Sequence, residues 1–200
     1  MTGTRAAWNP VARELFAAAG RRRVVVWRVP EGGRARRVNV LDRHSAAVGS
    51  LAWMPDGRRL VCVSADGRAV LWDALDGTFL ADVSSLDAHC TMAAVSPQGL
   101  VATAGADGMV VVGHPDGGWH QLALRHYDSA VECCAWSRSG HALAVGCDDG
   151  TVDLLAPRLT HLRTLSLPDG TARTLRWAPD DASLAVRAAD GTRHVLAVGD

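Results

Sequence analysis

Short apolar runs separated by turn residues repeat along the whole chain. The clearest example spans residues 44–84, where Met54-Pro55-Asp56-Gly57, Ala65-Asp66-Gly67 and Leu75-Asp76-Gly77 separate four runs of strand length. Pro, Asp and Gly favour tight turns, and short strands joined by tight turns form antiparallel sheets. The pattern predicts a four-stranded antiparallel meander with strands at about 48–53, 59–65, 69–74 and 78–84.

Two independent turn markers repeat with nearly the same period. The first marker is a turn position held by a proline or by Ser137-Arg138, and its successive copies are 45, 42, 41 and 41 residues apart. The second marker is an Asp-Gly pair, whose four copies are 41, 42 and 41 residues apart. A period near 41 residues is typical of the blades of a β-propeller. The copies are Pro10, Pro55, Pro97 and Pro179 for the first marker, and Asp66, Asp107, Asp149 and Asp190 for the second.

The markers divide the chain into five units within a single predicted domain, 1–200. The units are 1–43, 44–86, 87–127, 128–168 and 169–200. The fifth unit has no run for a fourth strand. Outside the template, the predicted strands lie at about 4–8, 14–20, 24–29, 35–41, 91–96, 100–106, 109–113, 119–125, 130–136, 141–147, 151–155, 161–167, 172–177, 183–189 and 192–198.

Several inner runs are apolar on both faces, among them 60–63, 109–112 and 143–145. A strand with one exposed face alternates between apolar and polar residues, so these runs predict strands that lie between two neighbouring sheets. The fourth run of the first unit, 35–40, alternates and carries charge, as an edge strand does. The predicted fold class is therefore all-β, a propeller of four-stranded antiparallel blades.

The residues at the blade corners resemble those of the WD-repeat β-propellers. In that family a histidine before the first strand, a Ser or Thr in the second, an aspartate in the following turn and a tryptophan in the third pin each blade. The second unit has His44, Asp66 and Trp72-Asp73 at these places, with Cys62 at the hydroxyl place. The resemblance extends over about five degenerate repeats, and no repeat has the complete set.

The remaining units keep fewer of these residues. The third has Gly113-His114 in place of Trp-Asp, and the first keeps only Trp27. Buried imidazole, hydroxyl, carboxylate and indole groups can satisfy one another, and losing one partner costs roughly 1–3 kcal/mol. We expect the degenerate blades to be held by packing alone. The residues expected to pin blades are His44, Asp66, Trp72, His89, Thr103, Asp107, Asp149 and Asp190.

No motif predicts a catalytic residue, a metal ligand or a cofactor. The chain lacks Gly-x-Ser-x-Gly, Gly-x-x-x-x-Gly-Lys and His-Glu-x-x-His sequences. One carboxylate per Asp-Gly turn is too few for calcium, and the pair His114 and His120 lacks further ligands at a suitable spacing. Five cysteines without paired metal spacing predict reduced, packed thiols and a cytoplasmic protein.

Charge is distributed unevenly along the chain, although the formal net charge is zero. Residues 1–43 hold ten arginines and three acids, a balance of +7, and residues 44–200 have a balance of −7. Two groups of arginines stand out, Arg21, Arg22 and Arg23 in a turn and Arg36 and Arg37 on an edge strand. They are expected first to form a solvated face that keeps the chain soluble. The alternative is a docking face for an acidic protein, a phosphoinositide or RNA. Without interleaved aromatic residues, nucleic acid is a weaker candidate.

The resemblance implies a non-catalytic scaffold that assembles protein complexes. The alternatives are a recognition module of a larger propeller protein, of the trafficking, ciliary or ubiquitin-ligase adaptor type, and an enzyme carried on a propeller. Family members usually have seven blades, so five predict a piece of a longer propeller, a small imperfectly closed ring or a ring that another chain completes. An open arc exposes two blade faces and is expected to self-associate. No apolar run is long enough to span a membrane.

Overall fold

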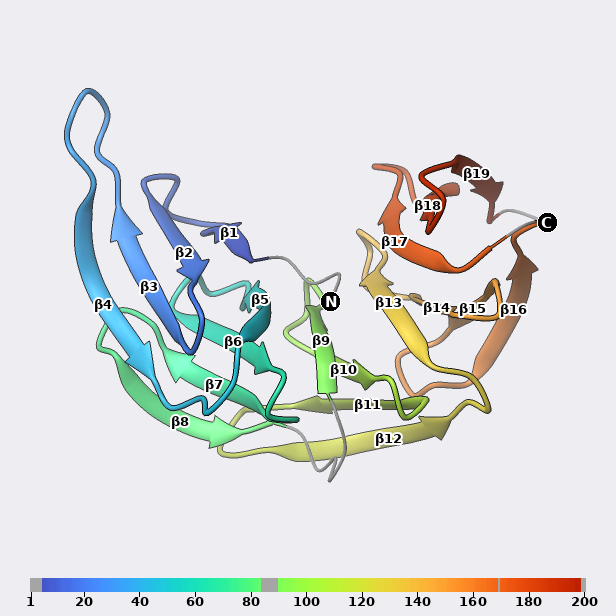
Figure 1. Ribbon diagram of the computed structural model, residues 1–200, viewed down its shortest axis with the longest axis horizontal. Helices are drawn as coiled ribbons and strands as arrows, with labels where there is room; N and C mark the ends of the chain where they lie inside the picture. Colours follow the sequence, from blue (N-terminus) through green and yellow to red (C-terminus); the bar gives the residue numbers. More distant parts are fainter. Residues whose placement is uncertain (1–4, 84–89, 169, 199–200) are drawn as a thin grey trace.

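The chain forms five antiparallel sheets that follow one another in sequence (Figure 1). The computed structural model describes residues 5–83, 90–168 and 170–198, and every regular element among them is a β-strand. The first four sheets have four strands each, and the fifth has three within the described residues. The predicted all-β fold of four-stranded blades is therefore confirmed.

The strands lie where the turn residues predict them, to within two residues at each end. Each sheet is a meander in which strands adjacent in the chain pair antiparallel. The strands are β1 (Ala6–Trp8), β2 (Leu15–Ala19), β3 (Arg23–Arg28), β4 (Arg36–Asp42), β5 (Val48–Trp53), β6 (Arg59–Ser64), β7 (Ala69–Asp73), β8 (Thr78–Asp82), β9 (Cys90–Val95), β10 (Val101–Gly105), β11 (Met109–His114), β12 (His120–His126), β13 (Val131–Trp136), β14 (Leu143–Cys147), β15 (Thr151–Leu155), β16 (His161–Ser166), β17 (Ala172–Trp177), β18 (Ser183–Ala188) and β19 (Arg193–Ala197).

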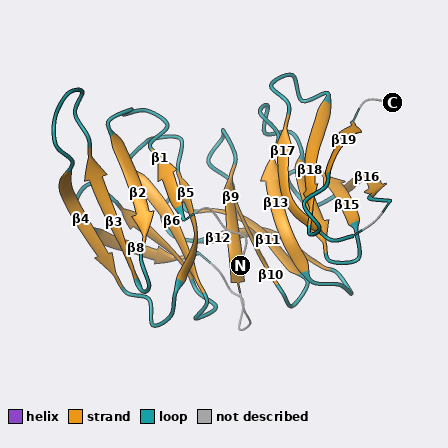
Figure 2. Cartoon of the chain, turned by 45° about the horizontal axis from the view of Figure 1, so that its top comes forward, coloured by secondary structure: helices purple, strands orange, loops and turns teal. Residues whose placement is uncertain are grey.

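The sheets are arranged around an arc as the blades of a propeller. The first strand of each sheet lies toward the inside of the arc, and the fourth strands β4, β8, β12 and β16 lie on its outer side (Figure 1). Loops gather at the two ends of the blades (Figure 2). These loops hold the Asp-Gly turns, where Gly108 has a φ of 79°. A Cβ on Gly108 would lie 2.2 Å from the carbonyl oxygen of Tyr127, so this turn requires glycine.

Burial follows the position of each strand within its blade. The inner strands β7, β10 and β14 are buried at every residue, whereas the outer strand β8 alternates between exposed and partly buried residues. Apolar clusters fill the space between the first and second sheets, between the second and third, and across the third, fourth and fifth. The runs predicted to be apolar on both faces therefore lie between neighbouring sheets.

The sheets form an open arc rather than a closed ring. Consecutive sheets pack through their first strands, β5 on β9, β9 on β13 and β13 on β17. The first and fifth sheets are at opposite ends of the arc (Figure 1). The outward face of the first sheet carries a row of paired aromatic residues, Trp8, Phe16 and Trp27. Trp8 is 63% exposed and contacts the ring of Phe16.

In the second and fifth blades, a tryptophan at the end of the first strand ties the blade to the preceding one. Nε1 of Trp53 donates to the carbonyl oxygen of Ala7 at 3.0 Å, and Nε1 of Trp177 donates to that of Ala135 at 2.9 Å. The acceptor is in each case the residue just before the corresponding position of the preceding blade. Trp8 occupies the same position in the first sheet, where the outward face is exposed.

Replacing Trp53 with phenylalanine should lower the free energy of unfolding by about 1–3 kcal/mol, because the carbonyl of Ala7 loses its donor at a packed interface. Trp8→Phe is the matched control, and it should change stability by less than about 0.5 kcal/mol because that indole faces solvent. Urea denaturation of both variants measures the difference. Equal losses in the two variants would contradict an interblade role for the Trp53 bond.

Candidate interaction surface

His44 and Asp66 join two loops at one end of the second blade. His44 precedes β5, Asp66 lies in the turn between β6 and β7, and their side chains are 2% and 6% exposed. Nδ1 of His44 lies 3.2 Å from Oδ2 of Asp66, and the backbone N–H of Ser45 donates to the same oxygen at 2.8 Å. The backbone N–H of Arg68 donates to Oδ1 at 3.1 Å. One carboxylate therefore ties the entry loop of the blade to its Asp-Gly turn.

At neutral pH the imidazole of His44 is uncharged and the carboxylate of Asp66 is ionised. Burial lowers the pKa of His44, and the negative charge of Asp66 offsets this only in part. Burial alone would raise the pKa of Asp66, but the N–H donors of Ser45 and Arg68, together with His44, lower it below its usual value. The protonated Nδ1 of a neutral ring is the nitrogen that can donate to this carboxylate.

The polar chain stops at the imidazole. Nε2 of His44 and Nε1 of Trp72 are buried without a hydrogen-bond partner among the described residues. In the WD-repeat pattern a serine or threonine hydroxyl stands at the place of Cys62, and a hydroxyl can both donate and accept hydrogen bonds. The buried thiol of Cys62 is a weak hydrogen-bond partner. The indole of Trp72 is held by apolar contact and packs edge-on against Phe79.

The four Asp-Gly aspartates share one local role. In each turn Oδ1 accepts the backbone N–H of the residue two positions later, which closes the turn. Asp149 and Asp190 make this contact in blades that lack the remaining family residues. The donors for Asp66, Asp107, Asp149 and Asp190 are the N–H groups of Arg68, Met109, Thr151 and Thr192, at 3.1, 3.1, 2.8 and 2.9 Å.

The third blade holds only part of the predicted set within the described residues. Thr103 is fully buried, Oδ2 of Asp107 is buried without a described partner, and His89 lies outside the described residues. Gly113 stands where the second blade has its tryptophan, and the ring of Trp119 lies directly against it. A Cβ on Gly113 would approach this ring to 2.7 Å. A tryptophan that directly precedes β12 therefore lies where the second blade has Trp72.

The fourth blade contains a buried polar group that the family pattern does not contain. Asp153 in β15 is 4% exposed, and it accepts a hydrogen bond from Thr164 Oγ1 at 2.6 Å. Arg125 Nη2 lies 3.3 Å from this carboxylate, and His161 Nε2 lies 3.7 Å from it. The expectation that the degenerate blades are held by packing alone is wrong for this blade, because side chains of β12 and β16 converge on one carboxylate of β15.

Arg21, Arg22 and Arg23 lie together at the end of the first blade that faces the His44 loop. With Gly20, Asp42 and His44 they line a surface hollow of about 550 Å³. Arg23 forms an ion pair with Asp42 at 2.7 Å, in which both side chains remain largely exposed. The hollow therefore presents an excess of positive charge beside the entry loop of the second blade.

Arg36 and Arg37 lie at the other end of the same blade. Within the β3–β4 pair, Arg23 stands opposite Asp42, whereas Arg28 stands opposite Arg36 and Trp27 opposite Arg37. Four residues of a strand span about 13 Å, so the two predicted groups of arginines do not form one compact site. The strand length of β3 separates them.

The fold and the sequence have relatives among known proteins. The β-propeller domain of Cps50 (Swd1) from Myceliophteria thermophila superimposes with a TM-score of 0.83 at 20% identity, covering 100% of this chain. The model of the WD domain, G-beta repeat, matches residues 35–73, which include His44, Asp66 and Trp72. The model of the anaphase-promoting complex subunit 4 WD40 domain matches residues 96–166. The chain belongs to the WD-repeat family of β-propellers.

This WD-repeat chain spans 66% of the length of the Cps50 (Swd1) chain that it matches. At this level of identity the likeness shows a shared fold. No curated protein matches the sequence. In the part of the WD-repeat chain that the structure describes, no three His, Cys, Asp or Glu side chains converge in a way that would hold a metal ion. No helix among the described residues is long and apolar enough to cross a membrane.

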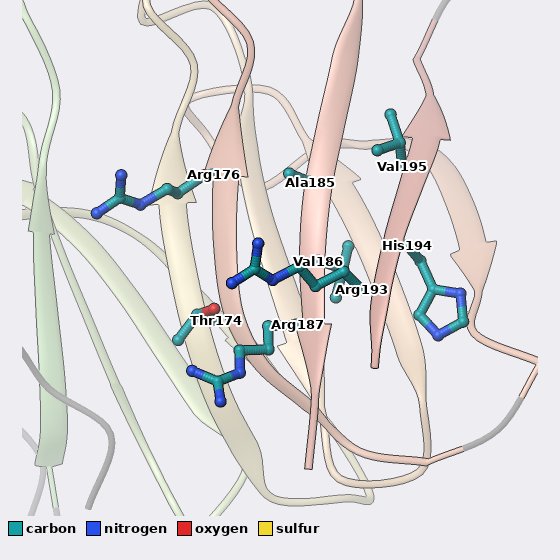
Figure 3. A pocket seen from close by; sticks show the side chains of 8 residues that line it. All are labelled: Thr174, Arg176, Ala185, Val186, Arg187, Arg193, His194 and Val195. Atoms are coloured by element: carbon teal, nitrogen blue, oxygen red, sulfur yellow. The ribbon is translucent and has the colours of Figure 1, made fainter. Parts of the chain in front are cut away.

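The WD-repeat chain has a second basic surface that was not predicted from its sequence. Arg176, Arg187 and Arg193 line one hollow on the outward face of the fifth blade (Figure 3). The signal in the sequence was an arginine within each of the predicted strands 172–177 and 183–189, whose counterparts in the other blades are small or apolar. It was overlooked because the charge balance of residues 44–200 is negative as a whole.

Lowering the pH below about 6.5 should destabilise the WD-repeat fold through His44. The pKa of His44 is lower in the folded than in the unfolded chain, so its contribution to stability is complete above the unfolded value and is lost as the pH falls through the folded value. The loss is at most about 1.4 kcal/mol per pH unit. Urea denaturation between about pH 7.5 and 5.5 measures it.

His44→Gln removes the titrating group and should flatten this pH dependence, whereas the exposed control His126→Gln should retain it. An unchanged pH dependence in His44→Gln would contradict the assignment of a neutral, buried imidazole.

Proposed function

We propose that this WD-repeat chain is a non-catalytic scaffold that binds protein partners in a multiprotein complex. The observation that carries the proposal is the basic hollow lined by Arg21, Arg22 and Arg23, which lies beside the pinned entry loop of the second blade. Packed sheets hold this turn in place, and loops at blade ends are free to vary for binding. Family likeness supports the scaffold class, because WD-repeat propellers are generally non-catalytic.

An acidic protein is the proposed partner of this hollow. Arg21 and Arg22 have no ion-pair partner among the described residues, and Asp42 neutralises only Arg23. Guanidinium groups form bidentate pairs with carboxylates, and a cluster of them raises the association rate of an acidic surface. No aromatic side chain is among the described residues that line this hollow, so an acidic protein is favoured over nucleic acid.

A recognition module of a larger propeller protein is the second candidate function. The observation that favours it is the coverage of 66% of the Cps50 (Swd1) chain, together with an arc whose sheets are not closed.

All five cysteines are free thiols, and burial raises the pKa of each one. Free thiols support a reducing compartment, and we propose the cytoplasm.

Reversing the charge of Arg21, Arg22 and Arg23 to glutamate should abolish the capture of acidic partners, because the hollow would then repel carboxylates. Quantitative mass spectrometry of pull-downs compares this variant with the unaltered chain at matched protein loading. Arg36→Glu with Arg37→Glu is the control at the other end of the blade and should retain most of the capture. Recovery of the same partners by all three proteins would contradict the hollow as a docking site.

A further inference from the structure

The outward face of the fifth blade carries arginine where inner blades carry small or apolar residues. Arg187 lies three residues before Asp190 of the Asp-Gly turn, and Arg193 lies three residues after it. Arg176 directly precedes Trp177, the last residue of β17. In the second and fourth blades, residues at these positions pack against the next blade, among them Val63, Ala69 and Val152 in the shared apolar clusters and Gly146 against Ala172. The equivalents of Arg176, Arg187 and Arg193 are Ala52, Val63 and Ala69 in the second blade, and Ala135, Gly146 and Val152 in the fourth.

The three guanidinium groups share one face, and among the described residues none of them forms an ion pair. Figure 3 shows the side chains of Arg176, Arg187 and Arg193 extending to the same side of the sheet, while the ring of His194 points the other way. They line a hollow of about 530 Å³. Neighbouring Arg173, by contrast, pairs with Glu132 at 2.6 Å. The face therefore holds three uncompensated positive charges.

The same blade has an open backbone edge. β19 has one neighbouring strand within the described residues, β18, whereas the other third strands β3, β7, β11 and β15 each have two. Bonds between Ala188 N–H and the Thr192 carbonyl, and between Val198 N–H and the Ala182 carbonyl, show which residues of β19 face β18. In an antiparallel strand the N–H and C=O groups of successive residues point to opposite sides. Those of Arg193, Val195 and Ala197 therefore point away from β18.

The fourth blade shows what these groups do when a strand is present. Val152 and Leu154 of β15, the equivalents of Arg193 and Val195, pair with Leu165 and Arg163 of β16. A strand beside β19 would therefore find donors and acceptors at the same spacing. Alternate side chains of that strand would lie on the face that carries the arginines.

We propose that the fifth blade binds an extended acidic segment of a protein partner as a fourth, outermost antiparallel strand. The inference deepens the proposed scaffold function and rests on it. The backbone of the segment pairs with Arg193, Val195 and Ala197, and carboxylates at every second position lie toward Arg193 and Arg187. Val195, which is 73% exposed, becomes covered by the added strand.

Charge and side-chain type distinguish between the possible occupants of the β19 edge, which are a second copy of the chain, a nucleic acid and an acidic segment. A second copy that paired through its own β19 would bring the same arginines together, which opposes association. The face offers Thr174, Ala185 and Val195 beside the arginines and no aromatic ring for base stacking, which disfavours nucleic acid. A strand-forming acidic segment uses both the open edge and the unpaired charges.

Binding of a fluorescent peptide tests this proposal with the whole chain. The probe has about eight residues in which glutamate alternates with threonine, a residue that favours strands. The control peptide has glutamine for glutamate, and it should bind at least about tenfold more weakly because charge-assisted pairs are lost. Fluorescence anisotropy at low and high salt measures both affinities.

Reversing the charge of one arginine at a time tests where the added strand lies. Successive strands lie about 4.8 Å apart, so Arg193 is one spacing from the peptide, Arg187 two and Arg176 three. Arg193→Glu should weaken binding about tenfold or more, Arg187→Glu less, and Arg176→Glu least. An equal effect of all three reversals would contradict strand addition, because it would mean that the peptide only responds to the net charge of the face.

Val195→Pro separates backbone pairing from charge. Proline removes the outward N–H of Val195 and leaves the bonds to β18 in place, because that N–H points away from β18. The variant should keep the circular dichroism and unfolding midpoint of the unaltered chain and lose at least about tenfold in peptide affinity. Undiminished binding would overturn the proposal, as would stronger binding of a single-stranded RNA of similar length or a dimer that Val195→Pro dissociates.

The outcome is distinguishable from a failure of the proposed function. Reversal of Arg21, Arg22 and Arg23 changes the opposite end of the arc and should leave peptide binding at the fifth blade within about twofold. Loss of partner capture in that variant with peptide binding intact would support the scaffold function at the first blade. Loss of peptide binding in Val195→Pro with capture intact would support the strand site alone.

Discussion

Each blade is stable because its neighbours cover its two apolar faces. A sheet whose inner strands are buried at every position, as β7, β10 and β14 are, has no solvated face of its own. Each blade must therefore be packed between two others, and the Trp53 and Trp177 bonds to preceding carbonyls hold consecutive blades in register. The same constraint makes the two ends of the arc chemically special, because there a face loses its neighbour.

The two ends meet this constraint differently. The first blade presents aromatic and aliphatic residues, including Trp8, of the kind that inner blades bury. The fifth blade instead carries Arg176, Arg187 and Arg193 at positions that inner blades fill with Ala, Val or Gly. Long charged side chains solvate a sheet face that would otherwise be apolar, and they also make it attractive to carboxylates. The ends of the arc therefore differ in the partners that they fit.

Local sequence predicted the strands, because each turn is encoded by the residues within it. Asp-Gly pairs close the turns through the Asp Oδ1 to N–H contacts at Arg68, Met109, Thr151 and Thr192, and these involve neighbours in the chain. Contacts between distant residues could not be found in this way. The ring of Trp119 over Gly113 and the convergence of Arg125 and Thr164 on Asp153 depend on how strands pair, which turn residues alone do not specify. The separation of Arg36 from Arg23 likewise follows from strand length.

Interspin distances between equivalent turn positions test the open arc most directly. Val11, Gln98, Ser139 and Asp180 are exposed and occupy the same turn in the first, third, fourth and fifth blades, so spin labels on cysteines at these sites report the spacing of blades. Burial raises the pKa of the native thiols, which makes the introduced cysteines the more reactive ones. An open arc predicts a longer distance for Val11→Cys with Asp180→Cys than for the adjacent pair Gln98→Cys with Ser139→Cys. Equal distances for the two pairs would mean that the first and fifth blades are neighbours in a closed ring, and would contradict it.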